Sequence, residues 1–176
     1  MKTYIALLRG INVGGHRELK MADLRVLFED LGFHEVVTYI QSGNVVFKTG
    51  NKNEFTEIIS KEIEIRYGWE VLILVKKVSE IKKIVDKTPF SEDKKEKSYY
   101  TLLHETPVSE LINSINPEDY PNEEFIITPG CVYFYSENGY GNAKCNNNFF
   151  ERKLKVAATT RNYRTLAKLV ELASKV

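Results

Sequence analysis

The spacing of hydrophobic positions changes repeatedly between strand and helix periods in the first half of the chain. Short β-rich runs predict strands at 3–8, 35–40, 45–48 and 69–75. Apolar residues recur every three or four positions in 21–31 and 54–67, which predicts two amphipathic helices. The resulting order, strand-helix-strand-strand-helix-strand, is typical of the ferredoxin-like fold, an antiparallel sheet with two helices on one face.

A similar but shorter series follows after residue 77. A linking helix is predicted at 78–85 and a charged, solvated loop at 91–97, followed by a strand at 99–103, a short helix at 108–115, strands at 125–127 and 132–135, and a helical C-terminal end. We therefore predict an α+β fold of tandem ferredoxin-like units. The first unit is 1–77, the link is 78–97, and the second unit, a partial copy, is 98–176. No residue-level repeat relates the two halves, so the duplication rests on element order alone.

Composition excludes several classes of protein. Of the 176 residues, 43% are hydrophobic, which is enough for a core and excludes coiled coils and disordered tails. The longest apolar runs, such as Val71–Val75, are far shorter than a membrane span, and no signal-peptide pattern opens the chain, so we expect a cytoplasmic protein. Cys131 and Cys145 have no metal or redox spacing and are predicted to be reduced thiols. The sequence predicts no metal and no cofactor.

Charge is distributed unevenly along the chain. The net charge is +1, but Lys and Arg are in excess in 1–20 and in 139–176, and the middle is acidic. Two interpretations are open: the basic ends pair with the acidic middle, or they form a basic surface that faces a ligand.

Two turns near the N-terminus combine glycine with polar side chains. The segment 9–15 (Arg-Gly-Ile-Asn-Val-Gly-Gly) lies between a strand and a helix, where glycines allow backbone N–H groups to converge on an anion. It is neither a Walker loop nor a dinucleotide fingerprint, so an ordinary tight connection is the alternative. The segment 41–44 (Gln-Ser-Gly-Asn) reads as a hairpin turn. Ser42 is not in a nucleophile elbow, but the amides of Gln41 and Asn44 are available for a ligand.

The third polar segment includes the start of the last predicted helix. Tyr163, Leu166 and Leu169 form the buried stripe of this helix, and Asn162 or Thr160 can cap its N-terminus. We expect Arg161 beside this cap with its charged side exposed. A cation there needs a bound anion or a carboxylate partner, and salt bridges to the acidic middle are the alternative to a ligand.

The segments 6–15, 21–24, 38–47 and 158–163 resemble the signature segments of a bacterial family called domain of unknown function 1697, and the match spans nearly the whole chain. The resemblance implies a small cytoplasmic α+β protein of tandem ferredoxin-like units. It does not imply any particular biochemical activity. Ala143 and Cys145 stand where the family has serine and leucine around a lysine, and Tyr163 stands where tryptophan is expected.

Other chemistry is weakly indicated. His16, His34 and His104 lack metal-ligand spacing. Tyr133 and Tyr135 share one face of a strand, where sheet packing is favoured over base stacking because no RNP1 pattern is present.

Two functional hypotheses follow. The first is a small phosphate-bearing or other anionic ligand bound in a cleft where the three segments converge. The candidate ligand-binding residues are Arg9, Gly10, Asn12, Gly14, Gly15, Gln41, Ser42, Asn44, Lys144, Arg161 and Asn162. The second is a non-enzymatic module that binds nucleic acid or protein through the basic C-terminal surface. No membrane partner is expected. The sequence identifies a site more clearly than a reaction.

Overall fold

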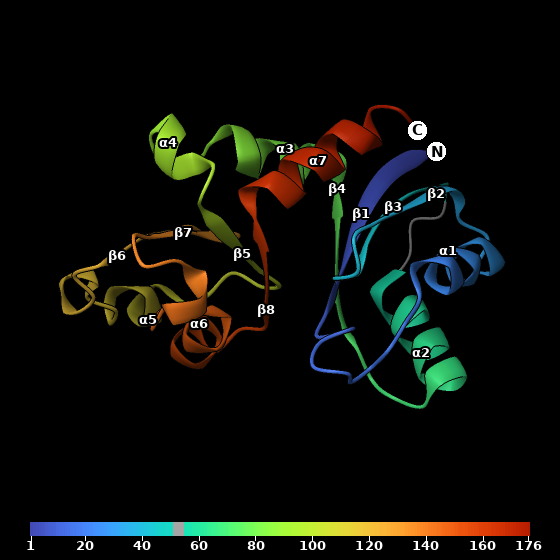
Figure 1. Ribbon diagram of the computed structural model, residues 1–176, viewed down its shortest axis with the longest axis horizontal. Coiled ribbons are helices and arrows are strands. Elements are labelled where there is room, and N and C mark those ends of the chain that lie inside the picture. The colour runs from blue at the N-terminus through green and yellow to red at the C-terminus, as the bar shows by residue number, and fades with distance from the viewer. Residues whose placement is uncertain (51–54) are drawn as a thin grey trace. The chain divides into compact units, whose positions relative to one another are not determined.

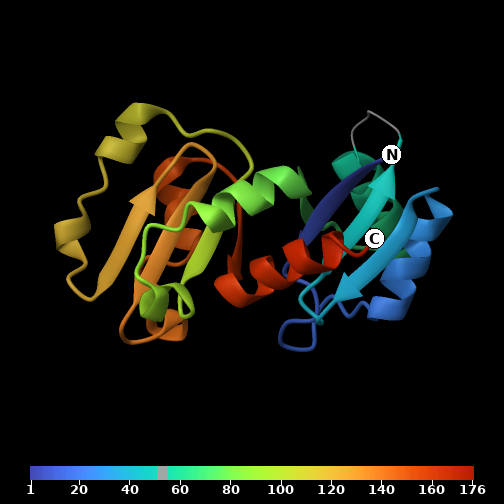
Figure 2. The same ribbon diagram turned by 90° about the horizontal axis from the view of Figure 1, so that it is seen from above.

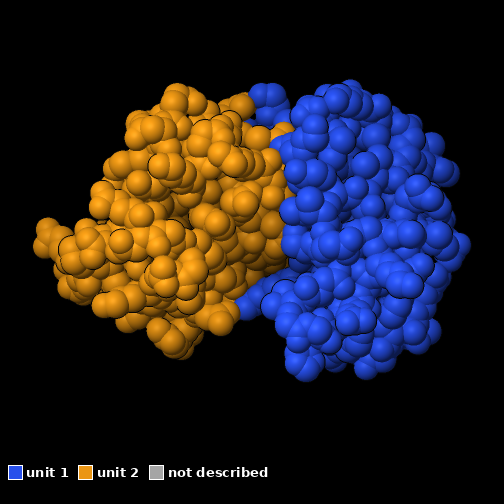
Figure 3. Space-filling view, viewed as in Figure 1, with its two compact units in different colours: residues 1–82, 168–176 blue, residues 83–167 orange. Residues whose placement is uncertain are grey.

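The structure is a computed structural model that describes residues 1–50 and 55–176. Contacts group these residues into two compact units, 1–82 with 168–176 and 83–167 (Figure 3). The division predicted at 77 and 97 rested on element order and stays a prediction. Within the described residues, no helix is long and apolar enough to cross a membrane.

The first unit is a four-stranded antiparallel sheet with two helices. Its elements are β1 (Lys2–Arg9), α1 (Met21–Asp30), β2 (His34–Tyr39), β3 (Asn44–Thr49), α2 (Phe55–Tyr67) and β4 (Leu72–Lys77). The strand order is β2-β3-β1-β4, and every pairing is antiparallel (Figures 1 and 2). The predicted βαββαβ arrangement is confirmed. Residue 54, predicted as the start of the second helix, lies outside the described residues.

The core of this unit fills the space between the sheet and its two helices. Ala6, Leu8 and Phe47 of the sheet share one cluster with residues of α1 and α2 such as Leu27 and Ile63. β1 is one of the two inner strands, and Ile5 to Leu8 are all buried, so its sequence is a continuous apolar run rather than an alternating one.

β4 begins later than the sequence suggested, at Leu72 instead of Trp69. Trp69 packs against the core cluster, and its ring centroid lies 5.8 Å from that of Tyr67. This packing explains why an apolar residue stands at position 69, although Trp69 lies in the connection after α2 rather than in the strand.

Two helices follow the first sheet. The predicted linking helix is α3 (Val78–Asp86), and the segment expected to be a charged loop contains a one-turn helix, α4 (Glu92–Lys95). The loop prediction is wrong for these four residues. Glu92 and Asp93 lie in the first turn and Lys94 and Lys95 in the last, and this order of charges favours a helix through its dipole.

The second unit repeats the topology of the first. Its elements are β5 (Tyr99–Leu103), α5 (Ser109–Asn113), the 3-10 turn η1 (Pro117–Asp119), β6 (Glu123–Ile127), β7 (Cys131–Ser136), the 3-10 turn η2 (Tyr140–Asn142), α6 (Asn147–Leu154) and β8 (Ala158–Asn162), followed by α7 (Tyr163–Ala173). The sheet order β6-β7-β5-β8 matches β2-β3-β1-β4 position by position, and all pairings are antiparallel (Figure 1). The predicted tandem ferredoxin-like units are confirmed.

The second unit has one strand more than the sequence indicated. The segment 158–162 was expected to belong to a helical end, but it forms β8, which pairs with β5 from Tyr99↔Asn162 to Leu103↔Ala158. The strand is short and polar, and it continues into α7 without a turn residue, so its local pattern did not separate it from the helix. With β8, the second copy contains all four strands instead of being partial.

Both cysteines are free and lie inside the second unit. Burial raises the pKa of the Cys131 thiol far above its ordinary value of 9.0. The pKa of the Cys145 thiol is also raised, mainly by burial and to a smaller extent by the hydrogen bond to Glu123. Because the thiolate is the reactive form, neither side chain is suited to act as a nucleophile at neutral pH.

We predict that the free energy of unfolding decreases as the pH rises above about 9, the ordinary pKa of a thiol. The unfolded chain releases the Cys131 proton there, whereas the folded chain retains it, so rising pH favours the unfolded state. Urea unfolding followed by far-ultraviolet circular dichroism, which reports on both units, measures the effect from pH 7 to pH 10. The Cys131→Ala variant should lose stability less steeply in this range, and an equally steep loss would contradict the assignment to Cys131.

Candidate functional site

The first two polar segments come together in the first unit. The Leu8 N–H donates to the Gly43 carbonyl at 2.8 Å. The Asn12 Nδ2 donates to the carbonyls of Leu19 (2.9 Å) and Gln41 (2.8 Å), and its Oδ1 accepts from the Leu19 N–H (2.8 Å). The bond to Gln41 thus connects the β1–α1 loop to the β2–β3 turn, the two bonds with Leu19 lie within the loop, and both amide protons of Asn12 are used.

The β2–β3 turn is closed tightly by its own residues. Asn44 is fully buried, and its Nδ2 donates to the Tyr39 carbonyl and to Ser42 Oγ, each at 2.9 Å. Gly43 has φ +77°, and an added Cβ would lie 2.6 Å from Ile11 Cδ1 and 2.8 Å from Leu8 Cβ. Only glycine fits at this point, where the turn contacts the end of β1.

The β1–α1 loop has an unusual backbone. Five of its residues have positive φ: Gly10, Asn12, Gly14, Gly15 and Arg17. Arg17 has φ +51°, a left-handed backbone conformation that is strained for a residue with a Cβ atom. At the tip the His16 N–H donates to the Val13 carbonyl at 3.0 Å. The N–H groups of Gly14 and Gly15 donate to no acceptor in the described parts of the chain.

These contacts enclose a hollow of about 320 Å³, which we name the loop cleft. It is lined by Asn12, Gly15, Glu18, Leu19, Lys20 and Gln41. The candidates Asn12, Gly15 and Gln41 therefore share one cleft. The candidates Arg9, Gly10, Gly14, Ser42 and Asn44 lie in the same two segments but are not among its lining residues.

Lys20 is a cleft residue that sequence reasoning missed. It is the N-cap residue of α1, and its side chain accepts no hydrogen bond from the first turn. The first N–H groups of that helix thus have no side-chain cap from this residue, and the positive end of the helix dipole lies beside a lysine. A signal was available, because Lys20 directly precedes the first apolar-periodic residue, where a Ser, Thr, Asp or Asn cap is usual.

Lys144 lies in the second unit, beside an internal carboxylate. The N–H groups of Lys144 and Cys145 donate to Glu123 Oε1 (2.6 Å) and Oε2 (2.8 Å). This pair of backbone donors already holds an anion from the chain itself. The side chain of Lys144 is exposed.

Asn162 and Arg161 end β8. Asn162 Oδ1 accepts from the Thr165 N–H at 2.8 Å, so Asn162 caps α7 as predicted. The expectation of an exposed Arg161 charge is wrong. Arg161 is a strand residue opposite Tyr100, its Nη1 donates to the Thr160 carbonyl at 2.9 Å, and burial lowers the pKa of its guanidinium to about 10. Arg161 therefore belongs to a paired strand and is half-buried, instead of lying at the exposed start of the helix.

Arg9 to Asn44 belong to the first unit and Lys144 to Asn162 to the second. The single cleft that would join all three segments therefore stays a prediction. Within the residues that the structure describes, no three His, Cys, Asp or Glu side chains gather as metal ligands do.

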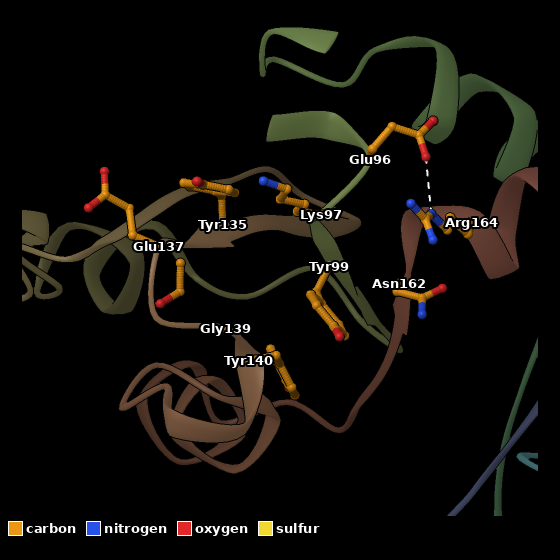
Figure 4. A pocket seen from close by; sticks show the side chains of 10 residues that line it. Glu96, Lys97, Tyr99, Tyr135, Glu137, Gly139, Tyr140, Asn162 and Arg164 are labelled. Atoms are coloured by element: carbon orange, nitrogen blue, oxygen red, sulfur yellow. Dashed lines mark hydrogen bonds and ion pairs between the residues drawn. The ribbon is translucent and has the colours of Figure 1, made fainter. Parts of the chain in front are cut away.

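A second hollow, of about 360 Å³, lies in the second unit (Figure 4). Tyr99 and Tyr140 stack on one side of it, with ring centroids 4.3 Å apart and planes 14° apart. On the other side Arg164 Nε pairs with Glu96 Oε2 at 3.1 Å. Lys97 and Glu137 also line it, so acids and bases are equal in number and the hollow has no excess of positive charge.

Three of the eight basic residues of the C-terminal segment 139–176 pair with carboxylates. Lys168 and Lys175 both bond to Glu171 and hold the pKa of that carboxyl at about 2. Arg164 pairs with Glu96 of the acidic middle. For these residues the structure favours internal pairing over a basic surface that faces a ligand.

The tyrosines of β7 do not form an open base-stacking face. Tyr133 is buried and its hydroxyl donates to the Ile84 carbonyl at 2.9 Å. Phe90 packs against Tyr135, with ring centroids 6.2 Å apart, and Lys94 Nζ lies 5.1 Å from the same ring. The sheet-packing interpretation of both tyrosines is therefore supported.

Comparison with known proteins establishes the family. The family model described as "Protein of unknown function (DUF1697)" matches residues 1–133, so the chain belongs to that family, and the resemblance seen in the sequence is confirmed. Among solved structures, the conserved bacterial protein SP0830 from Streptococcus pneumoniae is similar, with 21% identity, 98% of each chain covered and a TM-score of 0.66. At this identity the similarity shows the fold alone. No curated protein matches the chain.

We predict that Gly43→Ala lowers the free energy of unfolding by about 2–4 kcal/mol, because the new Cβ must displace Ile11 and Leu8 in addition to adopting positive φ. Gly32→Ala is a matched control, since Gly32 also has positive φ but an added Cβ meets no atom within 4 Å. The control should cost only about 1 kcal/mol in urea unfolding. Equal losses would show that the close approach of the turn to β1 is unimportant.

We also predict that Arg161→Ala destabilises the unliganded protein by about 1–3 kcal/mol, because it removes a half-buried side chain and its hydrogen bond. Lys144→Ala removes an exposed side chain and should change stability by less than about 0.5 kcal/mol. Chemical denaturation of both variants checks the difference. A neutral effect of Arg161→Ala would restore the exposed position expected from the sequence.

Proposed function

We propose that this member of the DUF1697 family, which we take to be a cytoplasmic bacterial protein, binds a small phosphate-bearing or other anionic ligand in the loop cleft. The observation that carries the proposal is the set of donors around the cleft. Gly15 contributes a backbone N–H without an acceptor in the described chain, Lys20 contributes an ammonium group, and α1 begins directly after Lys20, at Met21.

These donors have the chemistry that recognises anions. Free N–H groups at a loop and a helix N-terminus carry partial positive charge directed at the ligand, and a lysine adds a full charge. Hydrogen bonds to a charged partner contribute about 1.5–3 kcal/mol each, about twice the value for neutral partners. Glu18 also lines the cleft, so the local excess of positive charge comes from Lys20 together with the backbone donors.

The construction of the cleft supports a binding role. Asn12 holds the loop against the turn through one hydrogen bond to Gln41 and fixes the loop itself through two hydrogen bonds with Leu19. Gly43 permits the close contact between the turn and the end of β1. The strained Arg17 backbone persists only because the surrounding structure determines it. Strain of this kind clusters at ligand-binding sites, and a preformed cleft loses less entropy on binding.

The interaction-module hypothesis has weaker support. Its basic C-terminal residues Arg164, Lys168 and Lys175 are paired with carboxylates, and Arg161 is half-buried. A nucleic acid would have to displace these internal partners before it gained any contact of its own.

We expect Lys20→Ala to weaken the binding of a phosphate probe by about 10- to 100-fold, the value of one charge-assisted hydrogen bond. Isothermal titration calorimetry with inorganic phosphate and with AMP measures the change. Lys2→Ala is the matched control, because Lys2 is also an exposed lysine of the first unit but lies at the start of β1 and does not line the cleft.

Two results would reject the proposal. One is equal phosphate affinity in the Lys20→Ala, Lys2→Ala and unsubstituted proteins. The other is binding of long RNA that falls in proportion to charge removed anywhere on the C-terminal segment, which would establish the interaction module instead.

A further inference from the structure

We propose that the second unit holds a separate site for a small organic acid with an apolar body. The site is a pocket of about 490 Å³ between the end of α3 and the β6–β7 turn, and we name it the α3 pocket. Its volume lies within the range of about 300–1,000 Å³ that is typical of small-molecule sites. It contains none of the loop-cleft residues, so it stands independently of the function proposed above.

Both walls of the α3 pocket are held by hydrogen bonds within the unit. On the helix side, the Tyr133 hydroxyl donates to the Ile84 carbonyl at 2.9 Å. On the turn side, Thr128 Oγ1 donates to the Cys131 carbonyl (2.6 Å) and accepts from the Cys131 N–H (3.2 Å). The Thr128 N–H donates to the same carbonyl at 2.9 Å. The pocket is therefore preformed and does not depend on closure of a loop.

The floor and sides of the pocket are apolar. Ile84, Ile126 and Pro129 line it together with the ring of Tyr133. Ile126 lies on the edge strand β6 and is 46% exposed, a large apolar side chain that the fold leaves partly in water. The Tyr133 hydroxyl is already bonded to Ile84, so the pocket receives mainly its ring. An apolar body of about the size of one aromatic ring would remove this surface from water.

Among the residues that the structure describes, two lysines are the only charged ones that line the α3 pocket. Lys83 and Lys87 lie one helical turn apart, and the Lys87 N–H donates to the Lys83 carbonyl at 3.2 Å. Neither side chain has a hydrogen bond or ion pair to another described residue, and no carboxylate lines the pocket. Like charges at this spacing repel each other, so a carboxylate between them gains two attractions and relieves one repulsion.

The charge pattern distinguishes this pocket from the hollow beside Tyr99. There Glu96 occupies Arg164, whereas here both cations are available. Lys82 and Asp86 of the same helix do not line the α3 pocket and have interactions of their own. A neutral ligand would leave the two lysines unpaired, and a small inorganic anion would leave the apolar wall exposed. The pocket thus fits a ligand that carries both an anionic group and an apolar body.

The test uses 3-phenylpropionate, which combines one aromatic ring with one carboxylate. Calorimetric titration should show saturable binding at millimolar concentration or below. The double variant Lys83→Ala/Lys87→Ala should bind it at least about 10-fold more weakly, because the charge-assisted contacts are lost. Lys153→Ala is the control, since Lys153 is an exposed lysine of α6 that does not line the pocket.

Two further probes separate the apolar contribution from the charge. The neutral analogue 3-phenylpropanol and the small anion acetate should each bind at least about 10-fold more weakly than 3-phenylpropionate. The amide signals of Ile126 and Gly130 in two-dimensional NMR spectra should shift with the acid, which places it at this wall of the second unit.

The proposal is overturned by no saturable binding of 3-phenylpropionate, by equal affinity for the alcohol or for acetate, or by an unchanged affinity in the double variant. Loss of phosphate binding in Lys20→Ala with intact 3-phenylpropionate binding would support both sites separately. If no ligand binds to one of the two pockets, the binding test at the other can still be interpreted, because the two pockets share no residue.

Discussion

The antiparallel register of β1 against β3 is the constraint on which the candidate site depends. β1 pairs with β3 from Lys2↔Thr49 to Leu7↔Asn44, so the end of β1 must meet the start of β3. The loop after β1 therefore lies against the β2–β3 turn, where Leu8 bonds to Gly43 and Asn12 bonds to Gln41. The loop cleft follows from this register, because a slip of one residue would reverse the face on which each side chain lies and remove these bonds.

The two units use the same topology to build different chemistry. In the first unit the turn between the second and third strands is pressed against the central strand and borders a polar cleft. The corresponding turn of the second unit, Thr128 to Gly130, is fixed by Thr128 and borders the apolar α3 pocket. The sheet order is identical, so the difference comes from the side chains at one equivalent end. Two binding sites of different selectivity are thus compatible with one repeated fold.

Carboxylates of the chain take up much of its positive charge. In the C-terminal segment, Glu171 binds Lys168 and Lys175, and Glu96 binds Arg164. These pairs account for three of the eight basic residues of the segment. Exposed pairs of this kind stabilise the fold only slightly, but they reduce the field that would attract a polyanion. The cations that remain for a ligand are those whose surroundings contain no carboxylate partner, Lys83 and Lys87 being the clearest case.

The sequence by itself determined the elements whose hydrophobic period is strong. The four strands and two helices of the first unit were predictable because Leu24, Leu27 and Ile63 repeat at helix spacing and the strands are β-rich. It also indicated Asn162 as the cap of α7, which is a local interaction. It did not show β8, because a short polar strand is stabilised by pairing with β5 rather than by its own pattern.

Only the tertiary structure decided which polar residues are available for chemistry. Sequence motifs treated Asn12, Asn44, Lys144 and Arg161 alike as candidates. The fold places the amides of Asn12 and Asn44 in hydrogen bonds within the chain and buries the guanidinium of Arg161. The place of Lys20 in the loop cleft and the existence of the α3 pocket emerge only from the fold, because a cleft is defined by residues distant in sequence. Burial and hydrogen-bond partners depend on long-range strand pairing, and local spacing carries no information about it.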